Sequence, residues 1–260
     1  MKRWVLLLLW AFYGVAPART AQTLTLAVED DWFPYAAERN GQPEGFAVDV
    51  VREAYRAVGV DVTLKSMPYA RCMRVVRYGH MAGCFNSLKD ASTVRFYLFH
   101  NTPLFVADIG IYRQTGAPLR RPLTVNSLEG KRVGLTNGYT YGDAVERSVA
   151  FRKEYALSDL QNLRKLAAGR LDYVLMYSRV MDHLVGSHAL EFRGRFQRVG
   201  TAIENPLYVT FSPRHPQGEW AMEQLDAGLA VLHRSGRYHQ LEQRWAFGKA
   251  SPGGWHGQRP

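Results

Sequence analysis

The chain has 260 residues and a formal net charge of +10, from 33 Lys and Arg against 23 Asp and Glu. Its hydrophobic fraction of 47% and charged fraction of 22% are typical of a globular protein with a full core, and they exclude a largely disordered chain. The basic residues are dispersed and form no dense stripe within a recognisable module, so we expect no nucleic-acid partner.

The first residues have the pattern of a secretory signal peptide. Lys2 and Arg3 precede an unbroken apolar run at 4–15, and small residues follow it up to Ala18. The alternative is a membrane anchor, but the run is shorter than the roughly 20 residues that span a bilayer. We therefore predict that residues 1–18 are removed and that the mature protein lies in the periplasm.

The first half of the mature chain alternates strands and helices. Apolar residues at Val48, Val51 and Tyr55 recur at helical spacing, and Gly59 ends that helix. The predicted elements are a strand at 24–28, an aromatic-rich loop at 30–42, a helix at 47–58, a strand at 60–65, a helix at 70–78 and a strand at 81–85. This rhythm is typical of a doubly wound α/β sheet.

A second α/β unit follows a longer apolar strand at 104–112 and a polar loop at 114–122. Its predicted elements are a short helix at 127–130, a strand at 132–136, a helix at 141–150, a helix at 158–168, a strand at 172–177, a helix at 178–187 and a strand at 195–200. The chain closes with a strand at 207–212, helices at 218–235 and 237–245, and a frayed tail at 249–260.

The two cysteines, Cys72 and Cys84, fall in a predicted helix and in the strand that follows it. Export places them in an oxidising compartment, and the strand can fold back along the helix. We predict a disulfide between them. The alternatives are two buried free thiols or a metal pair, and the metal pair lacks suitably spaced histidines.

Several segments together resemble one family. They are Gly45-Phe46 with Asp49, the stretch 79–87 followed by Thr93-Val-Arg95, Pro103-Leu104, Leu128-Glu-Gly-Lys-Arg-Val-Gly134, Ala168-Gly-Arg-Leu-Asp172, and Ser235-Gly236 with Tyr238 and Trp245. In this order they resemble the solute-binding protein family 3, the periplasmic receptors of polar amino-acid ABC importers. The resemblance covers nearly the whole mature chain.

The resemblance implies a two-lobed periplasmic-binding-protein fold of type II, in which each lobe is a mixed sheet flanked by helices and two hinge strands cross between the lobes. Mapped onto this chain, lobe one is 22–107 plus 204–248 and lobe two is 108–203. The family traps its solute between the lobes and delivers it to an ABC permease or a membrane sensor. We expect a monomer without a cofactor or metal.

Arg95 is the leading site candidate, because the family's matching arginine holds the carboxylate of the ligand through its planar fork. The alternative is an ordinary surface arginine. Asn86 and Ser87 follow a predicted strand, where open α/β sheets place ligands, although a plain strand-ending turn explains them equally well.

Other candidates come from both predicted lobes. Glu29 and Trp32 follow the first strand, as an acid and a cleft wall, and the alternative for Trp32 is a lid over the core. Tyr69 and Arg71 begin a helix, and either a cleft role or a surface pair fits them.

In lobe two, Tyr139 and Thr140 lie at a strand end that opens a helix, where anions bind or where Thr140 simply caps the helix. Tyr177 stands where the family's amino-acid receptors carry the acid that pairs the ligand ammonium. An ordinary α-amino acid therefore lacks its expected partner, and either Glu29 substitutes or the ligand has no amine.

Two functions compete for this sequence. We predict a receptor that captures a small polar, carboxylate-bearing solute and does no chemistry on it. The alternative is a periplasmic enzyme of the same fold, such as a cyclohexadienyl dehydratase-like lyase, which requires a cleft carboxylate with a raised pKa. Glu29 is the only visible candidate for that acid.

Overall fold

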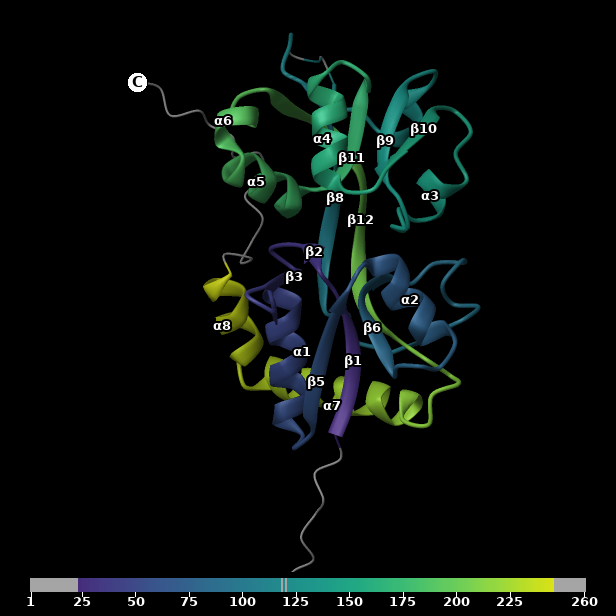
Figure 1. Ribbon diagram of the computed structural model, residues 1–260, viewed down its shortest axis with the longest axis vertical. Helices are drawn as coiled ribbons and strands as arrows, with labels where there is room; N and C mark the ends of the chain where they lie inside the picture. Colours follow the sequence, from purple (N-terminus) through teal and green to yellow (C-terminus); the bar gives the residue numbers. More distant parts are fainter. Residues whose placement is uncertain (1–22, 118, 120, 246–260) are drawn as a thin grey trace, which may run out of the picture.

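The computed structural model describes residues 23–117, 119 and 121–245. Figure 1 shows two α/β lobes that lie end to end along the long axis and are joined by two long strands. The predicted signal peptide at 1–18 and the tail at 249–260 lie outside the described residues. Within the described part, no helix combines the length and the apolar character needed to cross a membrane.

Lobe one begins with the predicted alternation of strands and helices. Its elements are β1 (Thr23–Glu29), α1 (Phe46–Ala57), β5 (Asp61–Met67), α2 (Tyr69–Arg77) and β6 (Gly83–Leu88). β1 runs parallel to both β5 and β6, so helical crossovers are required and the carboxyl ends of these strands meet at one edge. These elements confirm the prediction for this part of the chain.

The segment predicted as an aromatic-rich loop is instead a small antiparallel sheet. It contains β2 (Asp31–Trp32), β3 (Ala36–Arg39) and β4 (Gln42–Glu44). Asn40 and Gly41, which both have positive φ, form the two-residue connection between β3 and β4. An Asn-Gly pair is a strong hairpin signal, so the expectation of a loop was wrong here.

Lobe two is built around β9 (Arg132–Thr136), which runs parallel to its neighbours on both sides. Its elements are η1 (Val125–Leu128), β9, α3 (Asp143–Glu146), β10 (Arg152–Ala156), α4 (Asp159–Ala167), β11 (Tyr173–Tyr177), α5 (Ser178–Ser187) and α6 (Ala189–Phe192). The prediction of a helix at 141–150 was wrong, because only the short α3 forms there. The edge strand β10 was not predicted from the sequence.

Two long antiparallel strands, β8 (Phe105–Gln114) and β12 (Phe196–Phe211), connect the lobes. They lie in the middle of the strand order β10-β9-β11-β8-β12-β6-β1-β5, and β7 (Leu98–Phe99) pairs with β12 outside that path. The separate strands predicted at 195–200 and 207–212 are therefore one strand. The proposed lobe limits fall inside β8 and β12, and they stay a prediction.

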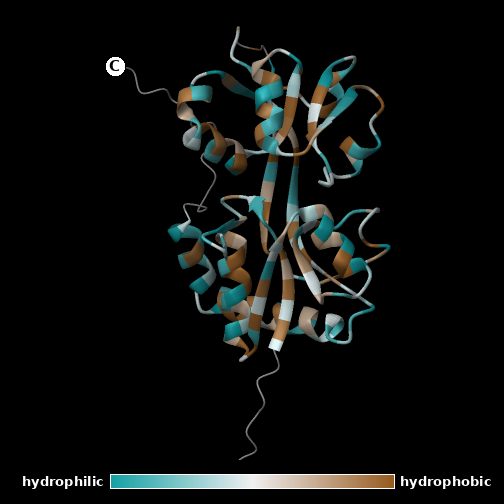
Figure 2. Cartoon of the chain, in the orientation of Figure 1, coloured by the Kyte–Doolittle hydropathy of each residue, from teal (hydrophilic) through white to brown (hydrophobic). Residues whose placement is uncertain are grey.

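The last two helices return to lobe one. α7 (Gly218–Arg234) packs against α1, where the Tyr55 hydroxyl donates a hydrogen bond of 2.9 Å to the carbonyl of Ala221. α8 (Arg237–Arg244) follows, and its Tyr238 hydroxyl donates to the carbonyl of Leu104. Figure 2 shows hydrophobic residues concentrated in the strands of both lobes and alternating with hydrophilic residues along the helices.

Candidate functional site

The carboxyl ends of the parallel strands of both lobes face each other across the junction in Figure 1. β1 ends at Glu29 in lobe one, while β9 ends at Thr136 and β11 ends at Tyr177 in lobe two. Side chains from the two sets of strand ends touch one another, as the contacts below show. This junction is where an open α/β architecture places a ligand.

Glu29 is the central charged group of the junction. Its side chain is only 4% exposed, and the hydroxyl of Tyr139 from lobe two is hydrogen-bonded to its carboxylate. Burial raises the pKa of Glu29 well above its ordinary value, and the nearby charge of Asp159 adds to that rise. A carboxyl group in this state gains strongly from a cation placed beside it.

Tyr69 joins the two lobes beside Glu29. Its hydroxyl donates a hydrogen bond of 3.2 Å to the Ser87 Oγ, and it is also hydrogen-bonded to Thr140. The rings of Tyr69 and Tyr139 meet edge to face with centroids 5.7 Å apart. The structure therefore brings together Glu29, Tyr69, Ser87, Tyr139 and Thr140, which the sequence analysis singled out separately.

Trp32 forms an aromatic wall of the same junction. It stacks on Tyr35 at 4.3 Å and meets Tyr177 of lobe two edge to face at 4.8 Å. The indole is 2% exposed, and its Nε1 has no hydrogen-bond partner among the described residues. A buried N–H without a partner is costly, so this group is suited to donate to a ligand.

Asn86 is a second buried residue whose polar side-chain atoms have no hydrogen-bond partner among the described residues. It precedes Ser87 in β6, is 6% exposed, and neither its Nδ2 nor its Oδ1 has a partner among the described residues. An amide can donate and accept, so it can meet either a carboxylate or an amine.

Asp159 is a second buried acid of the junction, and it was not predicted from the sequence. It is 7% exposed, and the hydroxyl of Thr136 donates a short hydrogen bond to its Oδ1. Burial raises its pKa to about 6. The sequence predicts a helix that starts at Ser158, and an acid in the first turn of a helix needs no further explanation. The missed signal was β10, because an acid just after a parallel strand lies at the same edge as the ends of β9 and β11.

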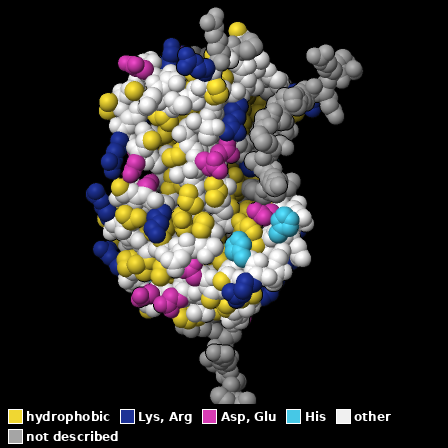
Figure 3. All heavy atoms as spheres, turned by 180° about the vertical axis from the view of Figure 1, so that it is seen from behind, with side chains coloured by type: hydrophobic (Ala, Val, Ile, Leu, Met, Phe, Trp, Pro, Cys, Tyr) yellow, Lys and Arg dark blue, Asp and Glu magenta, His cyan; other side chains and the backbone are white. Residues whose placement is uncertain are grey.

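The two candidate arginines lie outside this set of contacts. Arg95 and Arg71 are exposed, and neither guanidinium has a hydrogen bond or ion pair with another described residue. No Lys or Arg side chain is buried anywhere in the described ranges, whereas Glu29 and Asp159 are. The interior of the junction is therefore acidic. On the face drawn in Figure 3, Lys and Arg side chains are scattered rather than gathered.

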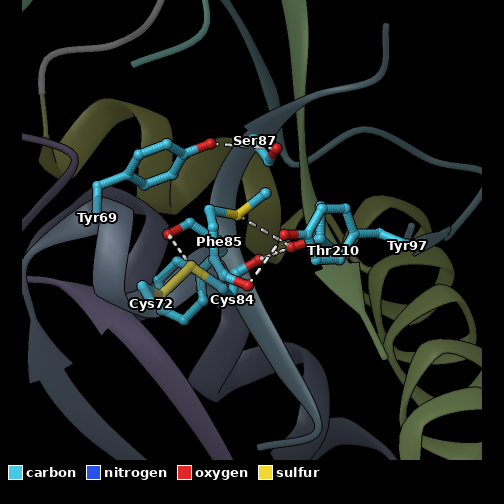
Figure 4. The surroundings of a disulfide bond; sticks show 8 residues. Tyr69, Cys72, Cys84, Phe85, Ser87, Tyr97 and Thr210 are labelled. Atoms are coloured by element: carbon cyan, nitrogen blue, oxygen red, sulfur yellow. Dashed lines mark hydrogen bonds between the residues drawn. A yellow bond between two sulfur atoms is a disulfide. The ribbon is translucent and has the colours of Figure 1, made fainter. Parts of the chain in front are cut away.

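The predicted disulfide is confirmed. Cys72 of α2 and Cys84 of β6 are bonded, with their Cα atoms 5.8 Å apart, and both are fully buried below Tyr69 (Figure 4). Among the described residues, no group of three or more His, Cys, Asp and Glu side chains is arranged to hold a metal ion.

Comparison with known proteins agrees with this architecture. The model of the bacterial extracellular solute-binding proteins, family 3, matches residues 24–249. The putative ABC transporter arginine-binding protein 2 of Escherichia coli strain K12 is 23% identical over 256 residues, which cover 94% of this chain and 99% of that protein. The family match confirms the resemblance predicted from the sequence.

Solved structures share the fold at low identity. An ancestral arginine-binding protein bound to arginine has a TM-score of 0.71 at 19% identity, covering 86% of this chain and 97% of that one. The arginine-, lysine-, histidine-binding protein ArtJ from Geobacillus stearothermophilus gives 0.71 at 20% identity, with 89% and 97% covered. A histidine kinase sensor domain with similarity to periplasmic binding proteins gives 0.72 at 18% identity, with 86% and 96% covered. These likenesses confirm the predicted fold class.

Proposed function

We propose that this chain, which belongs to the bacterial extracellular solute-binding proteins of family 3, traps a small solute bearing a cationic side chain and a carboxylate between its lobes. A basic amino acid such as arginine carries both groups. The curated relative and two of the similar structures are named as arginine-binding proteins, which supports this class of solute.

The observation that carries the proposal is the buried carboxylate of Glu29 in a junction without a buried Lys or Arg among the described residues. Removing a carboxylate from water is unfavourable unless a positive charge or several donors replace the water. Tyr139 supplies one donor. A ligand cation held between Glu29 and the surrounding tyrosine rings would supply the missing charge, and aromatic faces also attract cations.

The carboxylate of the solute has two sets of proposed partners. The first is Arg95, whose exposed guanidinium is not engaged with another described residue and whose fork matches a carboxylate. The second is the set of neutral donors from Asn86, Ser87 and Thr140.

Isothermal titration calorimetry of the mature protein with L-arginine and L-citrulline tests the proposal. The two solutes differ in that citrulline has a neutral ureido group in place of the guanidinium. We expect arginine to bind at least about tenfold more tightly, a difference of about 1.4 kcal/mol. Equal affinities, or no binding of arginine, would overturn the proposal.

A second arm of the titration tests Arg95 separately. Agmatine has the guanidinium of arginine and no carboxylate. In Arg95→Ala, we expect the affinity for arginine to fall while the affinity for agmatine stays as in the wild type. An unchanged arginine-to-agmatine ratio would remove Arg95 from the site and leave the role of Glu29 standing.

We further propose that the protein is a periplasmic monomer that delivers its solute to an ABC importer. The relative from Escherichia coli, named as an ABC transporter protein, supports an importer, while the kinase sensor domain shows that the fold also serves sensing. Deletion of the cognate permease should abolish uptake of labelled solute without affecting binding by the purified protein.

One observation favours the enzymatic alternative enough to test it. A buried acid with a raised pKa suits general acid catalysis, and both Glu29 and Asp159 have this property. A lyase would consume its ligand. Recovery of the bound solute unchanged after prolonged incubation, measured by mass spectrometry, supports binding alone, whereas a growing product peak supports the lyase.

A further inference from the structure

We propose that the Cys72–Cys84 disulfide is a positioning element of the solute site, which holds the first turn of α2 so that Tyr69 can bridge the two lobes. The inference rests on the proposed function for the choice of ligand in one arm of its test. It assigns to the disulfide a part in recognition, beyond keeping the lobe folded.

The disulfide lies directly next to the site residues of lobe one. Tyr69 begins α2, and Cys72 follows one turn later on the same helix. Cys84 precedes Ser87 in β6, and the Tyr69 hydroxyl donates its 3.2 Å hydrogen bond to that Ser87 Oγ. Figure 4 shows the Tyr69 ring above the sulfur atoms, with its hydroxyl directed toward Ser87. The covalent link and the hydrogen bond thus join the same helix to the same strand.

The link also reaches the strand that carries Glu29. Cys84 lies in register beside Ala27 of β1, two residues before Glu29. Cys72 is therefore tied to the part of the sheet that presents the buried acid. A displacement of α2 against this sheet would change the spacing between Tyr69 and Glu29 directly.

α2 packs its apolar face outside the main core of the protein. Its buried residues belong to a small cluster, separate from the main core of the protein, whose members are Ala27, Tyr69, Cys72, Val76 and Cys84. The rest of the helix includes exposed Arg71, Arg74 and Arg77. Partly buried Met73 and Val75 of α2 also pack against this cluster, so the disulfide adds a covalent restraint to an apolar contact.

The first turn of α2 is also the surface on which lobe two rests. Tyr69 is hydrogen-bonded to Thr140 and meets the ring of Tyr139, which in turn binds Glu29. A Cβ atom added at Gly138 would lie 3.0 Å from the Cβ of Ala70, so the lobes approach closely at this point. A shift of about 1 Å is enough to break a hydrogen bond.

A disulfide with only a stabilising role predicts a different outcome. Such a disulfide, which joins residues 12 positions apart, would act largely by restricting the unfolded chain. Its removal would lower the melting temperature and leave the folded protein's ligand affinity and interlobe contacts unchanged. Affinity and local exchange in the folded state therefore separate the two roles.

The experiment compares Cys72→Ala/Cys84→Ala with the matched control Val76→Ala. Val76 is fully buried in the same small cluster on α2, so its truncation weakens the same packing while keeping the disulfide. Both variants should melt at lower temperatures. For L-arginine measured well below the melting transition, we expect at least a tenfold loss of affinity in the cysteine-free protein and less than a threefold change in Val76→Ala.

Hydrogen exchange of the ligand-free proteins provides a readout that does not depend on the solute. We expect faster exchange across 137–141 of lobe two in the cysteine-free protein and unchanged exchange there in Val76→Ala. If arginine fails to bind the wild type, the proposed function is overturned and the exchange result still decides the inference. Unchanged affinity and unchanged exchange in a folded cysteine-free protein would overturn the inference alone.

Tyr69→Phe covers the case in which the cysteine-free protein does not fold. This variant retains the disulfide and loses only the hydroxyl that reaches Ser87 and Thr140. Exchange across 137–141 should rise in it as well, and arginine affinity should fall. If Tyr69→Phe matches the wild type in both, the hydrogen bonds of the Tyr69 hydroxyl do not bridge the lobes and the inference is overturned.

Discussion

At the scale of single residues, the candidate site contains acids that the fold keeps out of water. Glu29 and Asp159 come from opposite lobes, and the charge of Asp159 contributes to the raised pKa of Glu29. Without a cation beside them, burial shifts both carboxyl groups toward the protonated form. Binding of a cationic solute would reverse this preference, so ligand uptake should be accompanied by proton release.

The raised pKa of Asp159 makes the stability of the folded protein depend on pH. Burial raises its pKa from 3.8 to about 6, so the folded protein retains this proton where the unfolded chain has released it. The folded state is then favoured below this interval, and the contribution is lost as pH rises through it. We expect the melting temperature of the wild type to fall relative to that of Asp159→Asn between about pH 4 and pH 6.

Thermal unfolding of both ligand-free proteins across that interval provides the measurement. Asp159→Asn preserves the size of the side chain and removes its titration, together with the part of the Glu29 pKa shift that depends on the charge of Asp159. A constant difference in melting temperature across the interval would show that Asp159 has an ordinary pKa.

Part of the site could be predicted at this scale. Glu29 ends β1, Ser87 lies near the end of β6 and Tyr69 begins α2. Tyr139 and Thr140 lie between β9 and α3, and parallel sheets gather ligand contacts at such strand ends. Arg95 was predicted from a family motif alone, and its role in binding stays a prediction. Asp159 resembled a helix-capping acid, and only its neighbours in space distinguish it from one.

At the scale of elements, lobe one depends on close packing between α1 and α7. Gly228 of α7 lies so close to α1 that an added Cβ atom would be 2.1 Å from the carbonyl oxygen of Ala54. We expect Gly228→Ala to force the helices apart and to lower the free energy of unfolding by about 1–3 kcal/mol. Urea denaturation gives this value directly.

Gly186 provides the control for that substitution. It lies inside α5, and an added Cβ atom would meet no atom within 4 Å. Gly186→Ala should therefore leave the protein as stable as the wild type or stabilise it by up to about 1 kcal/mol. If the two alanine variants have the same stability, the close approach at Gly228 is not a constraint.

The elements missed from the sequence share a physical reason. The strands β2 and β4 contain two and three residues, too few to show a period. β10 carries charged side chains because it is an edge strand. β12 contains Gly200 and Pro206, which resemble breaks, but its pairing with β8 continues past both. The local sequence pattern predicts long, half-buried elements. The strands missed here depend instead on partners that are distant in the sequence.

At the scale of the whole molecule, the lobes are linked in two ways. The paired strands β8 and β12 run from one lobe to the other, and Trp32, Tyr69 and Glu29 of lobe one touch Tyr177 and Tyr139 of lobe two. A solute that replaces part of this second set of contacts would bind to both lobes at once. Such an arrangement lets binding energy bias the relative position of the lobes.

Calorimetric titration of L-arginine into the wild type and Glu29→Gln tests the central claim most directly. Gln keeps the size of the side chain and removes its charge. We predict that the wild type binds arginine and that Glu29→Gln, folded to the same melting profile, loses at least about thirtyfold in affinity, because breaking a buried charge pair costs about 2–5 kcal/mol. Equal affinities for the two proteins would contradict the account.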